Sequence, residues 1–149
     1  MYKKILVPLD GSHRAEAILP HVEELARCTE AEVIFLQVIE PVHIYADAHG
    51  YVADVSVDAS QRKIQIEGAR SYLDGLSGEF RKKGITGNSL VVEGPVVGRI
   101  IDVADSEGAD LIAMASHGRS GLSRVFYGSV AAGVLQQVDR PLLLIRAKE

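Results

Sequence analysis

Apolar and polar positions follow one another in blocks along the chain, and five of the apolar blocks are short and continuous. They cover residues 4–9 (KILVPL), 32–39 (EVIFLQVI), 89–93 (SLVVE), 110–115 (DLIAMA) and 141–147 (PLLLIRA). An unbroken apolar run of this length is typical of a strand that is buried on both faces of a parallel sheet. We therefore predict five parallel strands covered by helices.

Apolar residues at helical spacing lie between these runs. The four stripes occupy residues 15–26, 69–80, 97–104 and 131–138. Apolar residues that recur three and four positions apart predict helices that each bury one face. Pro20 falls inside the first stripe and predicts a kink, because an interior proline removes a backbone hydrogen bond.

Residue types that are common at helix ends mark where these helices begin and stop. Asp58 opens a capping-box pattern before the second helix, and Ser129 is expected to cap the fourth. Gly84 and Gly108 are expected to end the second and third helices, because glycine adopts the left-handed conformation found at many helix ends.

Strands and helices therefore alternate in the order β-α-β-α-β-α-β-α-β. This order predicts an α/β fold with a single doubly wound, five-stranded parallel sheet and helices on both faces, in one domain over residues 1–149. The segment from Glu40 to Val57 fits neither pattern, and we interpret it as a surface loop and a candidate lid.

Composition narrows the class of protein further. Hydrophobic residues make up 47% of the chain and charged residues 24%, with a net charge of −4, which does not favour a broad nucleic-acid-binding surface. No apolar run is long enough to span a membrane. Cys28 is the single cysteine, which excludes an internal disulfide, and we expect it to be a buried apolar residue. We predict a cytoplasmic protein without nucleic-acid or membrane partners.

Two connections follow strands in a way that suggests a ligand site. Doubly wound sheets bind ligands beyond the carboxyl ends of their strands, where the strand order reverses. The candidates are "VPLDGS" after the first strand and "MASHGRSGLSRVFYGS", residues 114–129, after the fourth. Both combine small residues with polar ones, although Asp10 beside Gly11 also fits a plain turn.

The second connection has the residues of a phosphate cradle. Gly128 and Ser129 open a helix, where free backbone N–H groups and the helix dipole favour an anion. Arg119 and Arg124 are available to phosphate oxygens, and Gly118 leaves room for close approach. The alternative is that the glycines only make turns and Ser129 only caps the helix. The pattern is neither a Walker loop nor a Rossmann glycine motif.

The chain resembles the universal stress protein family nearly from end to end. The strings "ILVPLDGS" and "GADLIAMASHG" are typical of that family, whose nucleotide-binding branch has the motif G-x2-G-x9-G-[ST] after the fourth strand. Here Ala115, Gly118, Gly128 and Ser129 match the spacing in full, with alanine in place of the first glycine. Losses in this motif mark a second branch that does not bind ATP. Alanine is tolerated if position 115 is strand-like with a negative φ.

The resemblance implies a strand order 3-2-1-4-5 and a nucleotide between strands one and four. It implies that Asp10 bonds the ribose, that the backbone of Val38 holds the adenine edge, and that the start of the fourth helix holds the phosphates. The implied nucleotide-binding residues are Pro8, Leu9, Asp10, Val38, Met114, Ala115, Gly118, Arg119, Gly128, Ser129 and Val130. The ligand would be ATP or another adenine nucleotide, with Mg²⁺ or Mn²⁺ on its phosphates.

The same residues do not suggest efficient catalysis. We assign no catalytic residue and no metal-binding residue, because the five histidines show no ligand spacing and no base or acidic pair is evident. A stress-response or regulatory binding module is the main interpretation. The alternatives are a slow ATPase or autophosphorylating protein that uses Ser116, Ser123 or Ser129, and a nucleotide-independent interaction module.

The last predicted strand also indicates a partner. In the implied strand order it lies at a sheet edge, where unpaired backbone groups are exposed. Residues Leu142 to Ile145 are four consecutive apolar residues, flanked only by Pro141 and Arg146. We predict a homodimer in which two copies of this strand meet about a two-fold axis, as relatives often do.

Overall fold

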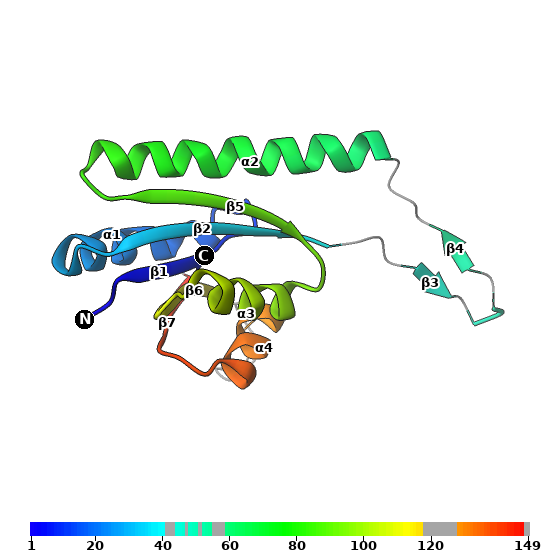
Figure 1. Cartoon of the computed structure of the whole chain (residues 1–149). Coiled ribbons are helices and arrows are strands. Elements are labelled where there is room, and N and C mark those ends of the chain that lie inside the picture. Colours follow the sequence, from blue (N-terminus) through cyan, green and yellow to red (C-terminus); the bar gives the residue numbers. More distant parts are fainter. Residues whose placement is uncertain (41–43, 47, 51, 55–58, 118–127, 148–149) are drawn as a thin grey trace.

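The computed structural model describes residues 1–40, 44–46, 48–50, 52–54, 59–117 and 128–147, and within them five parallel strands form one sheet (Figure 1). The sheet strands are β1 (Lys4–Pro8), β2 (Glu32–Ile39), β5 (Gly87–Glu93), β6 (Leu111–His117) and β7 (Leu142–Ala147). Their order is β5-β2-β1-β6-β7, which in chain order is 3-2-1-4-5. The predicted fold class and strand order are therefore confirmed.

Helices cover both faces of this sheet. They are the short 3-10 helix η1 (Ala15–Ile18) and the α-helices α1 (Leu19–Thr29), α2 (Ala59–Lys82), α3 (Val96–Glu107) and α4 (Ser129–Gln137). Figure 1 shows α2 on one side of the sheet and α3 and α4 on the other. Buried side chains of η1, α1 and α2 form one core with the sheet, and those of α3 and α4 form the second.

Successive strand residues divide between these two cores, as strand geometry requires. Ile5 and Val7 of β1 pack on the α1 and α2 side, whereas Leu6 packs on the α3 and α4 side. All three side chains have no exposed area, which is why the first strand reads as a continuous apolar run. On the first side, the rings of Phe35 and Phe80 meet edge to face with centroids 5.0 Å apart.

The helix ends confirm two expectations and correct a third. The predicted stops hold: α2 ends at Lys82 shortly before Gly84, and α3 is followed by Gly108, with φ values of +82° and +68°. Ser129 does not cap α4. It is the first helical residue, Gly128 occupies the N-cap with an extended ψ of 156°, and no side chain caps this end. The chain enters α4 one residue earlier than we predicted.

Pro20 does not kink a helix. The α-helix begins at Leu19, so the proline stands in the first turn, where its missing N–H costs no intrahelical hydrogen bond. Residues 15–18 of the predicted helix form η1 instead. Cys28 is exposed rather than buried, because it lies away from the face of α1 that buries Val22 and Ala26.

The segment between β2 and α2 is more structured than a loop. Within its described residues, β3 (Ile44–Ala46) and β4 (Val52–Asp54) pair as an antiparallel hairpin, and Gly50 between them has a φ of +80°. Each strand has only three residues, too few to register as a periodic pattern. In Figure 1 the hairpin lies away from the five-stranded sheet. Asp58, the first residue of the proposed capping box, lies outside the described residues.

Candidate functional site

Pairing between β1 and β6, the strands on either side of the point where the chain order of the sheet reverses, stops early. β1 is in register with β2 along its whole length, from Lys4 opposite Glu32 to Pro8 opposite Leu36. With β6 it pairs only at Ile5 and Leu6. The strands thus part toward their carboxyl ends, at the point where the chain order of the sheet reverses. A crevice at this position is where doubly wound folds bind ligands.

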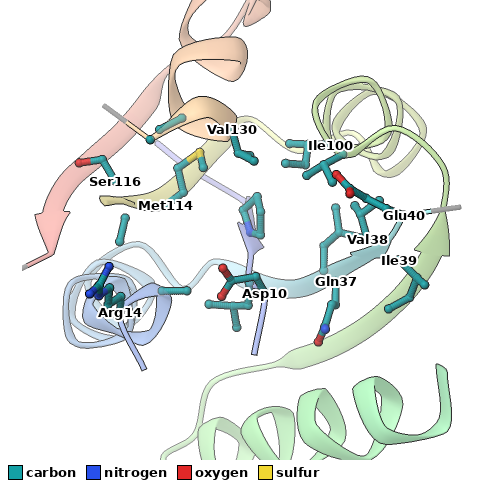
Figure 2. A pocket seen from close by; sticks show the side chains of 18 of the residues that line it. Asp10, Arg14, Gln37, Val38, Ile39, Glu40, Ile100, Met114, Ser116 and Val130 are labelled. Atoms are coloured by element: carbon teal, nitrogen blue, oxygen red, sulfur yellow. The ribbon is translucent and has the colours of Figure 1, made fainter. Parts of the chain in front are cut away.

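A cavity of about 370 Å³ occupies this crevice (Figure 2). Its walls come from the ends of β1, β2 and β6, the segment before η1 and its first residue, one residue of α2, and the first turns of α3 and α4. The lining residues are Pro8, Leu9, Asp10, Arg14, Ala15, Leu36, Gln37, Val38, Ile39, Glu40, Gln65, Val96, Ile100, Met114, Ala115, Ser116, Gly128, Val130 and Ala131.

One part of the cavity is apolar. Val38 from β2, Ile100 from α3, and Met114 and Val130 from β6 and α4 lie around it in Figure 2. These side chains belong to the core between the sheet and the second pair of helices. An apolar wall of this kind suits a flat ring, which loses little by leaving water.

The turn after β1 places a carboxylate in the wall of the cavity. Gly11 has a φ of +82°, a conformation that favours glycine. The N–H of Ser12 donates to Oδ1 of Asp10 at 2.9 Å, and the N–H of Ala15 donates to Oγ of Ser12 at 3.2 Å. In Figure 2 Asp10 lies centrally in the cavity. The sequence "DGS" therefore forms a tight turn whose first residue, Asp10, lines the cavity.

Position 115 tolerates its alanine. Ala115 lies within β6 and pairs with Ile145 of β7, so its backbone is extended. Among the described residues Glu30 alone has a positive φ without being glycine. β6 runs two residues beyond its predicted end, and the next residue, Ser116, is buried, with its hydroxyl donating to the carbonyl of Ile145 at 3.3 Å. Alanine in place of the motif glycine therefore imposes no strain on the strand.

The start of α4 presents backbone groups to the cavity. Gly128 and Val130 line it, and the carbonyl of Gly128 accepts the N–H of Ala132 at 2.9 Å, which is the first bond of the helix. The N–H groups before Ala132 have no intrahelical acceptor and carry the positive end of the helix dipole. This end of the cavity can therefore accept a negative charge.

Most of the residues predicted for the site come together here. Pro8, Leu9, Asp10, Val38, Met114, Ala115, Gly128 and Val130 all line the cavity. Ser129 is exposed and is not among the lining residues. Gly118, Arg119, Ser123 and Arg124 lie outside the described residues.

Sequence reasoning missed several polar lining residues. Arg14, Gln37, Glu40 and Gln65 come from the segment before η1, from β2 and its end, and from α2. No motif connects them, because only the folded sheet brings these segments to one edge. The weak signal that existed was position: Gln37 and Glu40 lie close to the carboxyl end of a predicted strand.

A hydrogen bond joins α2 to η1, the element that follows the Asp10 turn. Tyr72 of α2 donates its hydroxyl to Oε1 of Glu16 in η1 at 2.6 Å. Burial of the phenol raises the pKa of Tyr72 above its usual value, and the bond to Glu16 and the charges of Glu16 and Asp10 raise it further. The charge of Asp10, the carboxylate in the cavity, is the smallest of these contributions.

Other kinds of site are less evident in the described part of the chain. No group of three or more histidine, cysteine, aspartate or glutamate residues there could hold a metal ion. No helix in that part is long and apolar enough to cross a membrane.

A doubly wound parallel sheet with a part-apolar, part-polar cavity at its switch point is the arrangement in which many α/β proteins bind small molecules. The chain belongs to the Universal stress protein family, whose profile matches residues 1–146. This confirms the resemblance seen in the sequence.

Individual relatives agree with this assignment. Universal stress protein MJ0577 of Methanocaldococcus jannaschii is 31% identical over 157 residues, covering 99% of this chain and 97% of its own length. A solved structure of MJ0577 superposes with a TM-score of 0.78 at 30% identity, covering 100% of this chain and 99% of that one.

Two further solved structures share the fold at lower identity. A universal stress protein in complex with cAMP has a TM-score of 0.68 and 19% identity, covering 99% of this chain and 98% of that one. The universal stress protein of Archaeoglobus fulgidus in complex with dAMP has a TM-score of 0.60 and 22% identity, with coverages of 97% and 98%.

Proposed function

We propose that the chain binds an adenine nucleotide in the cavity between β1 and β6 and acts as a regulatory, stress-response protein. One observation carries the proposal: a single cavity joins an apolar wall to the N-terminus of α4 at the switch point of the sheet. The apolar wall suits a base and the helix end suits phosphate. Family members of the same fold in complex with cAMP and dAMP support adenine as the base.

The proposed placement follows the chemistry of the walls. The adenine ring lies against Ile100 and Met114, with its polar edge on the backbone of Val38. The ribose hydroxyls bond the carboxylate of Asp10. The phosphates lie toward Gly128 and the free N–H groups of α4, with Pro8, Leu9, Ala115 and Val130 closing the walls. Gly118, Arg119 and Ser129 complete the proposed set from the sequence.

We propose a binding role rather than efficient catalysis. The titratable side chains that line the cavity within the described residues are Asp10, Arg14 and Glu40. The described lining contains no histidine, cysteine or lysine, the side chains that most often serve as a base or an activated nucleophile. Mg²⁺ or Mn²⁺ would come with the nucleotide phosphates. Slow hydrolysis or self-phosphorylation is the alternative, and Ser116 is the acceptor residue that lines the cavity.

We also propose a homodimer through β7. The strand lies at the edge of the five-stranded sheet, and Leu142, Leu143, Leu144 and Ile145 are only partly buried. A second copy paired along this edge would satisfy the strand's open backbone groups and cover these side chains. One nucleotide-binding domain over residues 1–149 and a cytoplasmic location stay predictions from the sequence.

Titration calorimetry tests the proposed function. ATP, ADP, AMP and cyclic AMP are titrated into the full chain at ligand concentrations approaching millimolar, with and without Mg²⁺. Heat that saturates with at least one of them supports the proposal, and no heat with any of them overturns it. Incubation with γ-labelled ATP then separates binding from chemistry, since label on the protein or released phosphate would favour the alternative.

A further inference from the structure

The walls of the cavity hold one cationic side chain among the described residues, and sequence reasoning did not find it. Arg14 lines the cavity together with two carboxylates, Asp10 and Glu40. A phosphate chain brought into a cavity with two carboxylates meets repulsion unless a cation is near. The position of Arg14 therefore bears on where phosphates are tolerated.

The charged groups are spread along the cavity rather than mixed. Figure 2 shows Arg14 at the same end as Ser116, with Asp10 in the middle and Glu40 at the opposite end beside Val38 and Ile39. Gly128, at the N-terminus of α4, also lines the cavity. One end thus has the guanidinium of Arg14, and the other combines apolar side chains with the carboxylate of Glu40. Val130, at the start of α4, lies across the cavity from Asp10.

The backbone of Arg14 is held in place by the turn that precedes it. Asp10 bonds the N–H of Ser12, and the hydroxyl of Ser12 bonds the N–H of Ala15, so hydrogen bonds bracket residue 14 on both sides. Its φ and ψ of −64° and −41° are those of a helical residue, and its side chain is exposed. The fixed backbone keeps the guanidinium within reach of the cavity, and its planar fork loses less freedom per hydrogen bond than a lysine would.

We infer that Arg14 is a residue that selects the phosphate state of the ligand, in addition to the Arg119 proposed from the sequence. This role rests on the proposed nucleotide site. There the guanidinium of Arg14 binds the phosphate chain from the wall opposite the N-terminus of α4. It makes the cavity prefer polyanionic nucleotides such as ATP and ADP over cyclic AMP and adenosine. Asp10 would otherwise repel the more highly charged ligands.

The test compares ligands that share adenosine and differ in phosphate charge. Calorimetry measures the dissociation constants of ATP, cyclic AMP and adenosine for the unmodified chain and for Arg14→Gln. Arg14→Gln loses a charge-assisted hydrogen bond, so the dissociation constant of ATP should rise by about tenfold to a hundredfold. The affinity for adenosine should be unchanged, and the affinity for cyclic AMP should fall less than that for ATP. Arg14→Lys, which keeps the charge without the planar fork, should recover part of the ATP affinity.

Arg70→Gln is the matched control, because Arg70 is exposed on α2 and does not line the cavity. It should leave every affinity unchanged. The gap between Arg14→Gln and the unmodified chain should also narrow as salt is raised, since screening weakens a partly exposed ion pair. Equal weakening of ATP and adenosine by Arg14→Gln, or no weakening of either, would overturn the role of Arg14 and leave the nucleotide site standing. Absence of binding by the unmodified chain would overturn the proposed function itself.

Discussion

The hydroxyl of Tyr72 on α2 lies 2.6 Å from Oε1 of Glu16 on η1, so one hydrogen bond joins the longest helix to the segment that follows the Asp10 turn. The two residues are 56 positions apart in the chain. The bond fixes η1 against α2 on the side of the sheet where the first core lies. Its loss would therefore act on stability and on the rim of the cavity together.

Tyr72→Phe should destabilise the fold by about 1–2 kcal/mol, because Glu16 loses a donor while the ring packing is kept. Chemical denaturation at neutral pH measures the change in the free energy of unfolding. Glu16→Gln keeps an acceptor for Tyr72 and should cost less. An unchanged midpoint in Tyr72→Phe would show that water replaces the bond without loss.

The raised pKa of Tyr72 also predicts a pH dependence. Because the pKa is higher in the folded state, the stabilisation is complete below a pH of about 10, the ordinary pKa of tyrosine, and is lost as the pH rises above it. The free energy of unfolding of the unmodified chain should therefore fall more steeply above that pH than that of Tyr72→Phe. Parallel curves for the two proteins would contradict the shift.

Two glycine-to-alanine changes should have opposite effects on the stability of the fold. An added Cβ at Gly133 of α4 would come within 2.7 Å of Cγ2 of Val97 on α3, whereas at Gly75 of α2 it would meet nothing within 4 Å. Gly75→Ala should stabilise the protein by up to about 1 kcal/mol through helix propensity. Gly133→Ala gains the same propensity but must displace a stiff β-branched side chain, at a cost of about 1–3 kcal/mol.

Thermal melts of the two variants beside the unmodified chain give the comparison directly. Gly75→Ala is the internal control, since it has the same chemical change in a helix with open space. A rise in Tm for both variants would mean that α3 and α4 separate easily, and would weaken the account of a tightly packed second core.

Gly128→Val should abolish nucleotide binding while the fold is kept. The φ of Gly128 is −48°, which other residues can adopt, so the effect comes from a branched side chain at the proposed approach to the N–H groups of α4. Calorimetry with ATP measures binding, and circular dichroism checks the fold. Ala115→Gly restores the family motif within an extended strand and should bind ATP equally well or better. Normal binding by a folded Gly128→Val would place the phosphates elsewhere.

The fold was more accessible to sequence reasoning than the site. The buried strands can be recognised as continuous apolar runs in the sequence, because both of their faces are apolar, as in residues 5–7 of β1. The errors have local causes: Pro20 is equally compatible with a helix start, and three-residue strands such as β3 are shorter than any periodic signal. Arg14 and Gln65 join the cavity only through the topology of the sheet, which no local pattern encodes.

The edge strand carries the last prediction. Residues 142–145 of β7 are partly buried against their own chain, and one side of the strand has no neighbour in the five-stranded sheet. If two copies pair there, Leu143→Lys and Leu144→Lys place charges at the interface, one on each face of the strand, and each should shift the mass in solution from dimer to monomer at micromolar concentration. Light scattering measures the mass, and circular dichroism verifies that each variant is folded. Leu135→Lys, which adds the same charge at an exposed leucine of α4, is the matched control and should stay dimeric. A monomeric unmodified chain would end the prediction, and a dimer that survives both strand substitutions would move the interface to another surface.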